Sequence, residues 1–216
     1  MRANIDHGSG ALRPTWRGRL HAIGALLSVA VGLLLVRGAD TTPGRTAVVL
    51  LACCMAVTYA VSAWYHIVVR TPLAQAVLKR IDHAMIFVLI AGSHTALCVV
   101  TLKGPLLGWA VVVAWFIALV GVLLQLTGRM ARLAEIGYAV AGWGALGVMP
   151  WMWSSAGSVL WWVLLSGVLY SVGALAFARQ WPRKSCARFG YHEVWHVVTL
   201  LSGAMHFVAV ARLAGV

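Results

Sequence analysis

Seven apolar runs make up most of this sequence, and each is close to the ~20 residues that a helix needs to cross about 30 Å of hydrocarbon. The runs lie at about 20–36, 46–69, 81–102, 106–126, 135–153, 157–178 and 189–211. Of the 216 residues, 62% are hydrophobic and only 10% are charged, whereas a water-soluble domain needs far more charged surface. The sequence therefore predicts an all-α fold in which seven helices form a transmembrane bundle.

The segments outside these runs carry further expectations. Residues 1–18 are expected to form a cytoplasmic N-terminal tail, and residues 19–216 the seven-helix transmembrane domain. Thr71 as a helix N-cap and Pro72 at the first helical position predict a short interfacial helix between the second and third runs. Arginines precede the first run as in a signal peptide, but no A-x-A-type cleavage site follows, so this run is interpreted as a spanning helix.

The positions of Lys and Arg predict how the bundle is oriented. Thirteen of the 17 basic residues lie on the side of the N-terminus, and four lie on the other side. The thirteen are Arg2, Arg13, Arg17, Arg19, Arg70, Lys79, Arg80, Arg129, Arg132, Arg179, Arg183, Lys184 and Arg188. The positive-inside rule therefore predicts a cytoplasmic N-terminus and a C-terminus outside, with the protein in the cell's inner (plasma) membrane.

The net charge of +12 raises the question of a nucleic-acid partner. Proteins that bind nucleic acid carry their basic residues as a patch or stripe on one face of a domain. Here the basic residues lie in the gaps between apolar runs, as membrane topology requires. We therefore expect no nucleic-acid partner, and the sequence makes no prediction of the oligomeric state.

Three runs that are far apart in the sequence are predicted to bring polar side chains to one membrane level. Given this orientation, Ser62 and His66 lie near the cytoplasmic end of the second run, and Asp82 lies at the start of the third. His192 and His196 lie in the first two turns of the seventh run, which also begins inside. An ionisable side chain within a span is costly, so each is a candidate functional residue. Residues four apart share a helix face, so the two histidines of the seventh run point the same way.

The residue types at this level favour a zinc site. Three imidazoles and one water form the open tetrahedral ligand set of a catalytic zinc ion, so His66, His192 and His196 are the predicted ligands. Iron and manganese remain alternatives, although three imidazoles suit zinc best. Asp82, from a third helix, is predicted to hold or deprotonate the water, and Ser62 to donate a hydrogen bond to a developing oxyanion.

Each of these residues also has a purely structural interpretation. The two histidines of the seventh run could bond headgroups and backbone carbonyls at the membrane interface. Ser62 could bond the carbonyl four residues earlier, as is common in membrane helices, and spacing alone favours that reading. Asp82 could pair with Lys79, with Arg80 or with the helix N-terminus. The depth that the histidines share with His66 and Asp82 favours metal binding.

The remaining acid and histidines have less specific assignments. Glu193, in "HEVWH", either matches the general base of zinc proteases or faces the basic cytoplasmic rim. His206 lies ~15 Å beyond the last predicted ligand along its helix, and His94 is similarly deep, so neither can complete the same site. His21 and His83 are either structural or support the ligands from behind.

The motifs resemble those of a known family. "SAWYH", "LKRIDHAMIFVLIAGSHTAL" and "FGYHEVWHVVTLLSGAMHF" resemble the bacterial hemolysin III family, which is similar to the progestin and adipoQ receptors and, more remotely, to the alkaline ceramidases. The resemblance extends from "RGRLHAIG" at residue 17 to the last run. The third run departs from the usual "IAGTYTP": it reads "IAGSHTA", so a proline is missing and His94 replaces an aromatic residue.

The resemblance implies a seven-span bundle with the N-terminus inside and the C-terminus outside. It also implies a zinc ion near the cytoplasmic face, held by His66, His192 and His196. Asp82 would match the aspartate that contacts the metal-bound water, and Ser62 the serine one turn before the first ligand.

Four functions are compatible with these observations. The leading hypothesis is a zinc-dependent, hydrolase-like membrane protein that acts on a lipid amide or ester, with a membrane lipid as substrate or ligand. The second is a non-enzymatic sensor or regulator of membrane lipid state with structural zinc. An intramembrane metalloprotease that uses Glu193 and a pore-forming cytolysin are the other two.

Overall fold

The structure is a computed structural model of the chain, and it describes residues 14–69, 71–128, 130–183 and 188–216. Every regular element in these residues is a helix, so the all-α prediction is confirmed. The first thirteen residues of the predicted tail lie outside the described residues. So do five of the basic residues used to predict the orientation: Arg2, Arg13, Arg70, Arg129 and Lys184.

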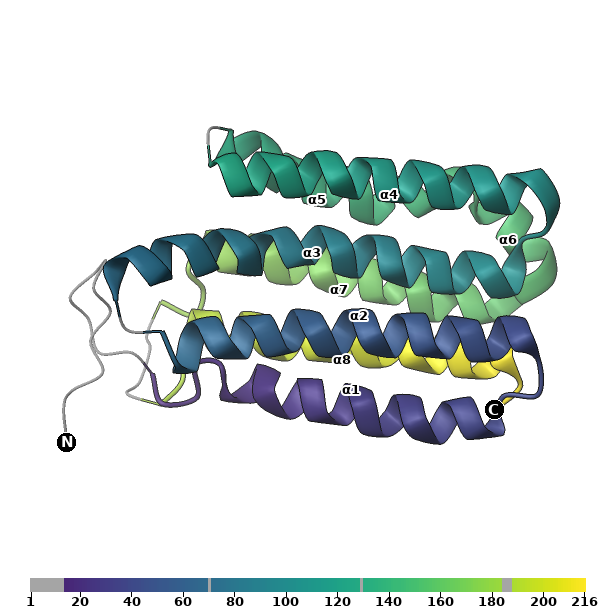
Figure 1. Cartoon of the computed structure of the whole chain (residues 1–216), viewed down its shortest axis with the longest axis horizontal. Coiled ribbons are helices and arrows are strands. Elements are labelled where there is room, and N and C mark those ends of the chain that lie inside the picture. The colour runs from purple at the N-terminus through teal and green to yellow at the C-terminus, as the bar shows by residue number, and fades with distance from the viewer. Residues whose placement is uncertain (1–13, 70, 129, 184–187) are drawn as a thin grey trace.

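The helices lie along one long axis and form two layers (Figure 1). Helices α1 to α4 follow one another across one layer, and α5, α7 and α8 form the layer behind it. In chain order the elements are α1 (Arg19–Gly38), α2 (Thr42–Ile67), α3 (Pro72–Thr101), α4 (Gly104–Thr127), α5 (Ala131–Trp143), η1 (Gly144–Gly147), α6 (Met149–Ala156), η2 (Gly157–Val159), α7 (Leu160–Ala178) and α8 (Tyr191–Ala214).

Six segments of the described residues are long and apolar enough to cross a membrane. They are Arg19–Gly38, Thr42–Ile67, Pro72–Thr101, Gly104–Thr127, Met149–Ala178 and Tyr191–Ala214. The fifth predicted run is broken into α5, a 3₁₀ turn and α6, so a count of seven unbroken helices is not confirmed. Glycines at 142, 144 and 147 favour the break because glycine is a poor helix former, and Pro150 lies in the first turn of α6, where its missing N–H costs nothing.

The start of α3 was predicted correctly, but the separate interfacial helix was wrong. Thr71 caps the helix by accepting a hydrogen bond from the Ala74 N–H at 3.4 Å, and Pro72 is the first helical residue. The helix then continues without interruption to Thr101. Asp82 therefore lies ten residues, or ~15 Å, from the start of α3 rather than at its first turn.

The bundle has an apolar outer surface and a tightly packed core around α2. Leu26, Trp109 and Phe116 are exposed on the outer helices, as expected of side chains that face lipid. Leu51 and Met55 of α2 are buried in the main cluster of core side chains. The sides of the bundle are therefore suited to contact with lipid.

Helix α8 approaches α2 closely at Gly203. A Cβ on Gly203 would lie 2.5 Å from the Tyr59 hydroxyl oxygen, so no larger residue fits without movement. The Tyr59 hydroxyl in turn donates to the Thr199 carbonyl of α8 at 3.0 Å. Close contact through a small residue, with an interhelical hydrogen bond beside it, is how helices associate in lipid. This contact holds together the two helices that carry the predicted ligands.

Candidate metal centre

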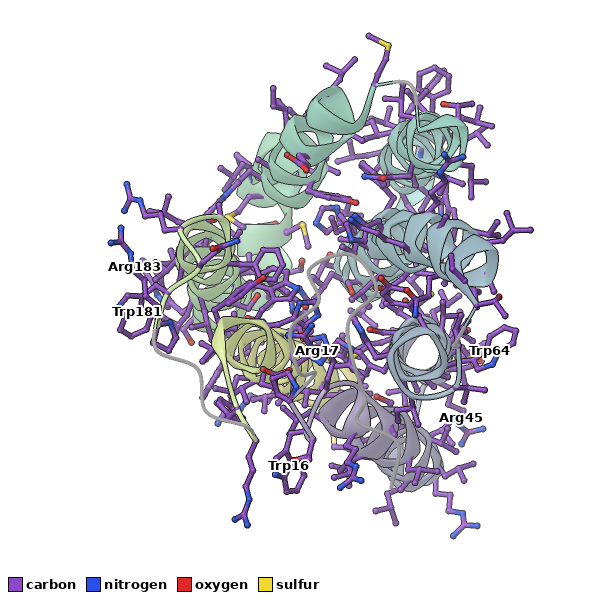
Figure 2. The ribbon with its side chains drawn as sticks, turned by 90° about the vertical axis from the view of Figure 1, so that its left-hand side faces the viewer. Trp16, Arg17, Arg45, Trp64, Trp181 and Arg183 are labelled. Carbon is purple, nitrogen blue, oxygen red and sulfur yellow. The ribbon has the colours of Figure 1, made fainter. Side chains whose placement is uncertain are left out.

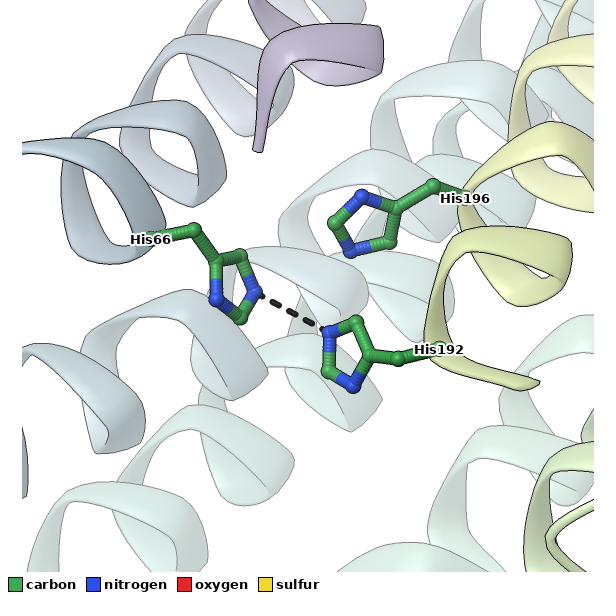
Figure 3. A group of neighbouring side chains, drawn as sticks. All are labelled: His66, His192 and His196. Carbon is green, nitrogen blue, oxygen red and sulfur yellow. Dashed lines mark hydrogen bonds between the residues drawn. The ribbon is translucent and has the colours of Figure 1, made fainter. Parts of the chain in front are cut away.

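Three imidazoles from two helices meet at one end of the bundle (Figure 3). His66 lies in the last turn of α2, and His192 and His196 lie in the first two turns of α8. Their potential ligand atoms all lie within 4.8 Å of one another, and the Nε2 atoms of His66 and His192 are 3.2 Å apart. The predicted convergence of these residues is therefore confirmed.

The arrangement of nitrogen atoms fits a zinc ion. In a tetrahedral site with Zn–N distances of roughly 2.0–2.1 Å, two imidazole nitrogens are about 3.3 Å apart. The 3.2 Å between His66 and His192 matches that spacing, and a small movement of His196 brings the third nitrogen to it. A neutral imidazole has one ring nitrogen that can offer a lone pair to a metal ion. The group could hold a metal ion, and its donor set suits zinc.

Asp82 and Ser62 lie beside the three histidines. The Asp82 Oδ2 atom is 4.0 Å from the Nε2 atom of His66, and a side-chain hydrogen bond joins Asp82 to Ser62. Arg80, one of the alternative partners of Asp82, donates instead to the Leu126 carbonyl at 3.2 Å. Three helices therefore contribute polar groups to one site, as the sequence predicted.

Both carboxylate oxygens of Glu193 have hydrogen-bond partners, and neither partner suits a catalytic base. Its Oε2 atom accepts from the Gly190 N–H at 2.8 Å and caps α8, while its Oε1 atom accepts from Arg17 Nε at 3.0 Å. The Glu193 side chain is 0% exposed. Glu193 does pair with a basic residue, Arg17, as one interpretation predicted. Its carboxylate, however, is buried inside the protein and does not face an exposed rim. Because both oxygens are engaged, Glu193 anchors the helix start and the segment before α1.

Comparison with known proteins assigns the chain to a family. Residues 10–207 match the family described as Haemolysin-III related. The chain belongs to the hemolysin III family. It is 29% identical over 197 residues to Hemolysin-3 of Bacillus cereus, which covers 88% of this chain and 86% of that protein. It is 30% identical over 196 residues to the Hemolysin-3 homolog of Bacillus subtilis (strain 168), which covers 88% of this chain and 89% of that protein.

The motif resemblance to the hemolysin III family is thus confirmed. Family membership and the six long apolar helices together make this hemolysin III protein a multi-pass membrane protein.

Within residues 14–69, 71–128, 130–183 and 188–216, the other histidines of this hemolysin III protein lie outside the three-histidine cluster. His206 lies within hydrogen-bonding distance of the Ser202 carbonyl and the Ser166 hydroxyl, through its Nδ1 atom. His94 hydrogen-bonds to the backbone of Gly142, where the fifth segment breaks, and so satisfies a polar group in an apolar region. Both are away from the site, as predicted. His21 is different, because its ring stacks directly on a predicted ligand, His196.

Proposed function

We propose that this hemolysin III protein is a zinc-dependent hydrolase that acts on an amide or ester bond of a membrane lipid. The observation that carries the proposal is the placement of Asp82 and Ser62 beside three converging imidazoles. A structural metal site needs its ligands only. A carboxylate with a hydroxyl at the edge of the ligand set supplies the acid–base and oxyanion groups that hydrolysis requires.

The proposed orientation has the N-terminus and the histidine cluster on the cytoplasmic side of the inner (plasma) membrane. Residues 1–18 are the cytoplasmic tail and residues 19–216 the transmembrane domain. The segment from α5 through η1 to α6 counts as the fifth of seven crossings, because it leads from the end of α4 back to the start of α7 (Figure 1). The start of α1 and the end of α8 lie at opposite ends of the bundle, which supports an odd number of crossings (Figure 1).

The roles of the residues follow from their positions. Zinc held by His66, His192 and His196 would supply Lewis acidity and lower the pKa of a bound water. The Asp82 carboxylate, 4.0 Å from His66 Nε2, accepts a proton at Oδ2 at the edge of the ligand set. Once Asp82 carries that proton it can donate to the Ser62 oxygen, which leaves the single Ser62 proton free to be donated to the substrate's carbonyl oxygen as negative charge develops there. Buried walls exclude bulk water and strengthen both interactions.

The proposed substrate is a lipid because of where the site lies. His66 is at the end of α2 and His192 at the start of α8, so the cluster is near headgroup depth in the proposed topology. An amide or ester linkage between headgroup and acyl chain lies at the same depth.

A regulator of membrane lipid state with structural zinc is the second candidate. It is favoured by the two-helix origin of the ligands, because an ion shared by α2 and α8 would tie together segments that are 126 residues apart in the sequence. An intramembrane protease is less well supported, because both carboxylate oxygens of Glu193 already have partners. The relatives are called Hemolysin-3, but the described residues offer no observation that favours a pore over these two candidates.

Release of fatty acid from amide and ester lipids by the purified protein tests the proposal. We expect turnover that is lost on chelation and restored by zinc. Asp82→Asn should abolish turnover yet retain the metal in elemental analysis, since Asp82 is not one of the three imidazole ligands. Glu193→Gln is the matched control and should retain turnover if it folds. Metal bound at one equivalent with no release from any lipid would favour the regulator.

A further inference from the structure

The segment before α1, residues 14–18, lies across the end of the bundle that holds the histidine cluster. In Figure 2, which looks at this end, Arg17 lies near the middle and Trp16 points outward. The Trp16 N–H donates to the Arg188 carbonyl at 3.3 Å, and Arg17 Nε donates to Glu193 at 3.0 Å. Glu193 follows the ligand His192 directly in the chain. The segment is therefore fastened to the start of α8 beside a ligand.

The next residue, Gly18, contacts the ligand of the other helix. Gly18 has a φ of +81°, a left-handed conformation that favours glycine. A Cβ at this position would lie 2.7 Å from the Cβ of His66. Both the backbone conformation and the space thus require glycine here. The segment rests against the base of the His66 side chain without intervening atoms.

One turn further on, His21 contacts the third ligand. Its ring stacks on the ring of His196 with 3.9 Å between centroids and 11° between planes. The Thr199 hydroxyl donates to the His196 carbonyl at 2.8 Å, so it accepts the hydrogen bond from Nε2 of His21 at 2.9 Å. His21 and His196 are both buried. One face of the His196 imidazole is therefore covered by a flat ring that is itself fixed to α8.

We propose that Arg17, Gly18 and His21 form an N-terminal clamp that positions the metal ligands of α2 and α8 relative to each other. The proposal rests on the metal centre of the proposed function but not on hydrolysis. The clamp touches ligands on both helices, so it sets the gap between them as well as the ring angle of His196. Contacts behind metal ligands commonly change metal affinity by about 10- to 100-fold when they are removed.

Replacement of His21 by Leu tests the stacking contact. Leu fills the volume but provides neither a flat ring nor a hydrogen bond to Thr199. We expect zinc affinity, measured by competition with a chromophoric chelator, to fall about 10- to 100-fold. The absorption bands of the cobalt(II)-loaded protein should also shift, because the geometry around the ion changes. His206→Leu is the control: His206 is another partly buried, hydrogen-bonded histidine of the bundle that lies outside the cluster, and both readouts should stay as in the native protein.

Replacement of Gly18 by Ala tests the clamp independently. Gly215 has the same φ of +81°, but a Cβ there would have no neighbour within 4 Å. Gly18→Ala and Gly215→Ala therefore both place an alanine at a φ of +81°, and only the first brings its Cβ against His66. We expect only Gly18→Ala to weaken zinc binding and shift the cobalt bands.

The outcomes separate this proposal from the hydrolase. If the native protein binds zinc but releases no fatty acid, the hydrolase fails and the clamp remains testable by affinity. If both His21→Leu and Gly18→Ala bind zinc with native affinity and give native cobalt spectra, the clamp is wrong while the metal centre stands. If the native protein binds no zinc or cobalt at all, the metal centre and the clamp both fall.

Discussion

Replacement of Arg17 by Gln tests the assignment of Glu193 as a structural carboxylate. Glu193 is 0% exposed, and Arg17, its charged partner, has a side chain that is 15% exposed. Removal of one partner of a buried ion pair leaves a charge without compensation and costs about 3–5 kcal/mol. Because water reaches part of Arg17, we expect about 3 kcal/mol for Arg17→Gln, at the low end of that range.

Glu193→Gln should cost less, although it removes the same ion pair. The amide oxygen can still accept from the Gly190 N–H, and no charge is left inside the protein. Arg17 can turn toward water because it is only partly buried. A lost hydrogen bond of this kind costs about 1 kcal/mol. In the Glu193→Gln background, Arg17→Gln loses only a hydrogen bond and should cost about 1 kcal/mol rather than about 3, so the two substitutions are coupled by about 2 kcal/mol.

Denaturant unfolding of the four proteins in one detergent measures this coupling. A chelator is present throughout, so that bound metal does not add to the stability of the folded state. A coupling energy within about 0.5 kcal/mol of zero would mean that the two residues act independently. In that case the carboxylate of Glu193 is not held by Arg17 in the folded protein, and it becomes available for a catalytic role.

Other perturbations test the metal centre and the helix contact that supports it. His192→Ala should lose the bound zinc in elemental analysis, since only two imidazoles remain, and retention of one equivalent would place the ion elsewhere. Acidification should release zinc because protonated imidazoles cannot bind it, and the pH of half-release should fall as free zinc is raised; zinc occupancy that does not depend on pH would contradict histidine ligation. Gly203→Ala pushes a methyl group against the Tyr59 hydroxyl and should cost about 1–3 kcal/mol and weaken zinc binding. Gly142→Ala, a helical glycine with no atom within 4 Å of a new Cβ, is its control, and equal losses from both would exclude the contact as the cause.

The helices could be predicted from the sequence because their signals are local. Run length and hydropathy identify a helix that can lie in lipid, and Thr71 and Pro72 mark a helix start because capping involves only neighbouring residues. The break in the fifth run was missed for a related reason. Hydropathy across 135–153 is continuous and so gives no sign of a break. The break at Gly144 depends on the low helix propensity of glycine and on the hydrogen bond between His94 of α3 and the backbone of Gly142.

The site, too, was predicted from the sequence only as far as local spacing and depth allow. That His192 and His196 face one way follows from their spacing alone, and the predicted depth of His66 and Asp82 depended only on counting along apolar runs. Their actual contacts depended on how α2, α3 and α8 are rotated and how closely they pack, for example at Gly203. The sequence also left His21 and Glu193 with two interpretations each, and the fold resolved their contacts. His21 meets His196 and Glu193 meets Arg17 across about 175 residues of chain, and no local pattern encodes the packing that joins them.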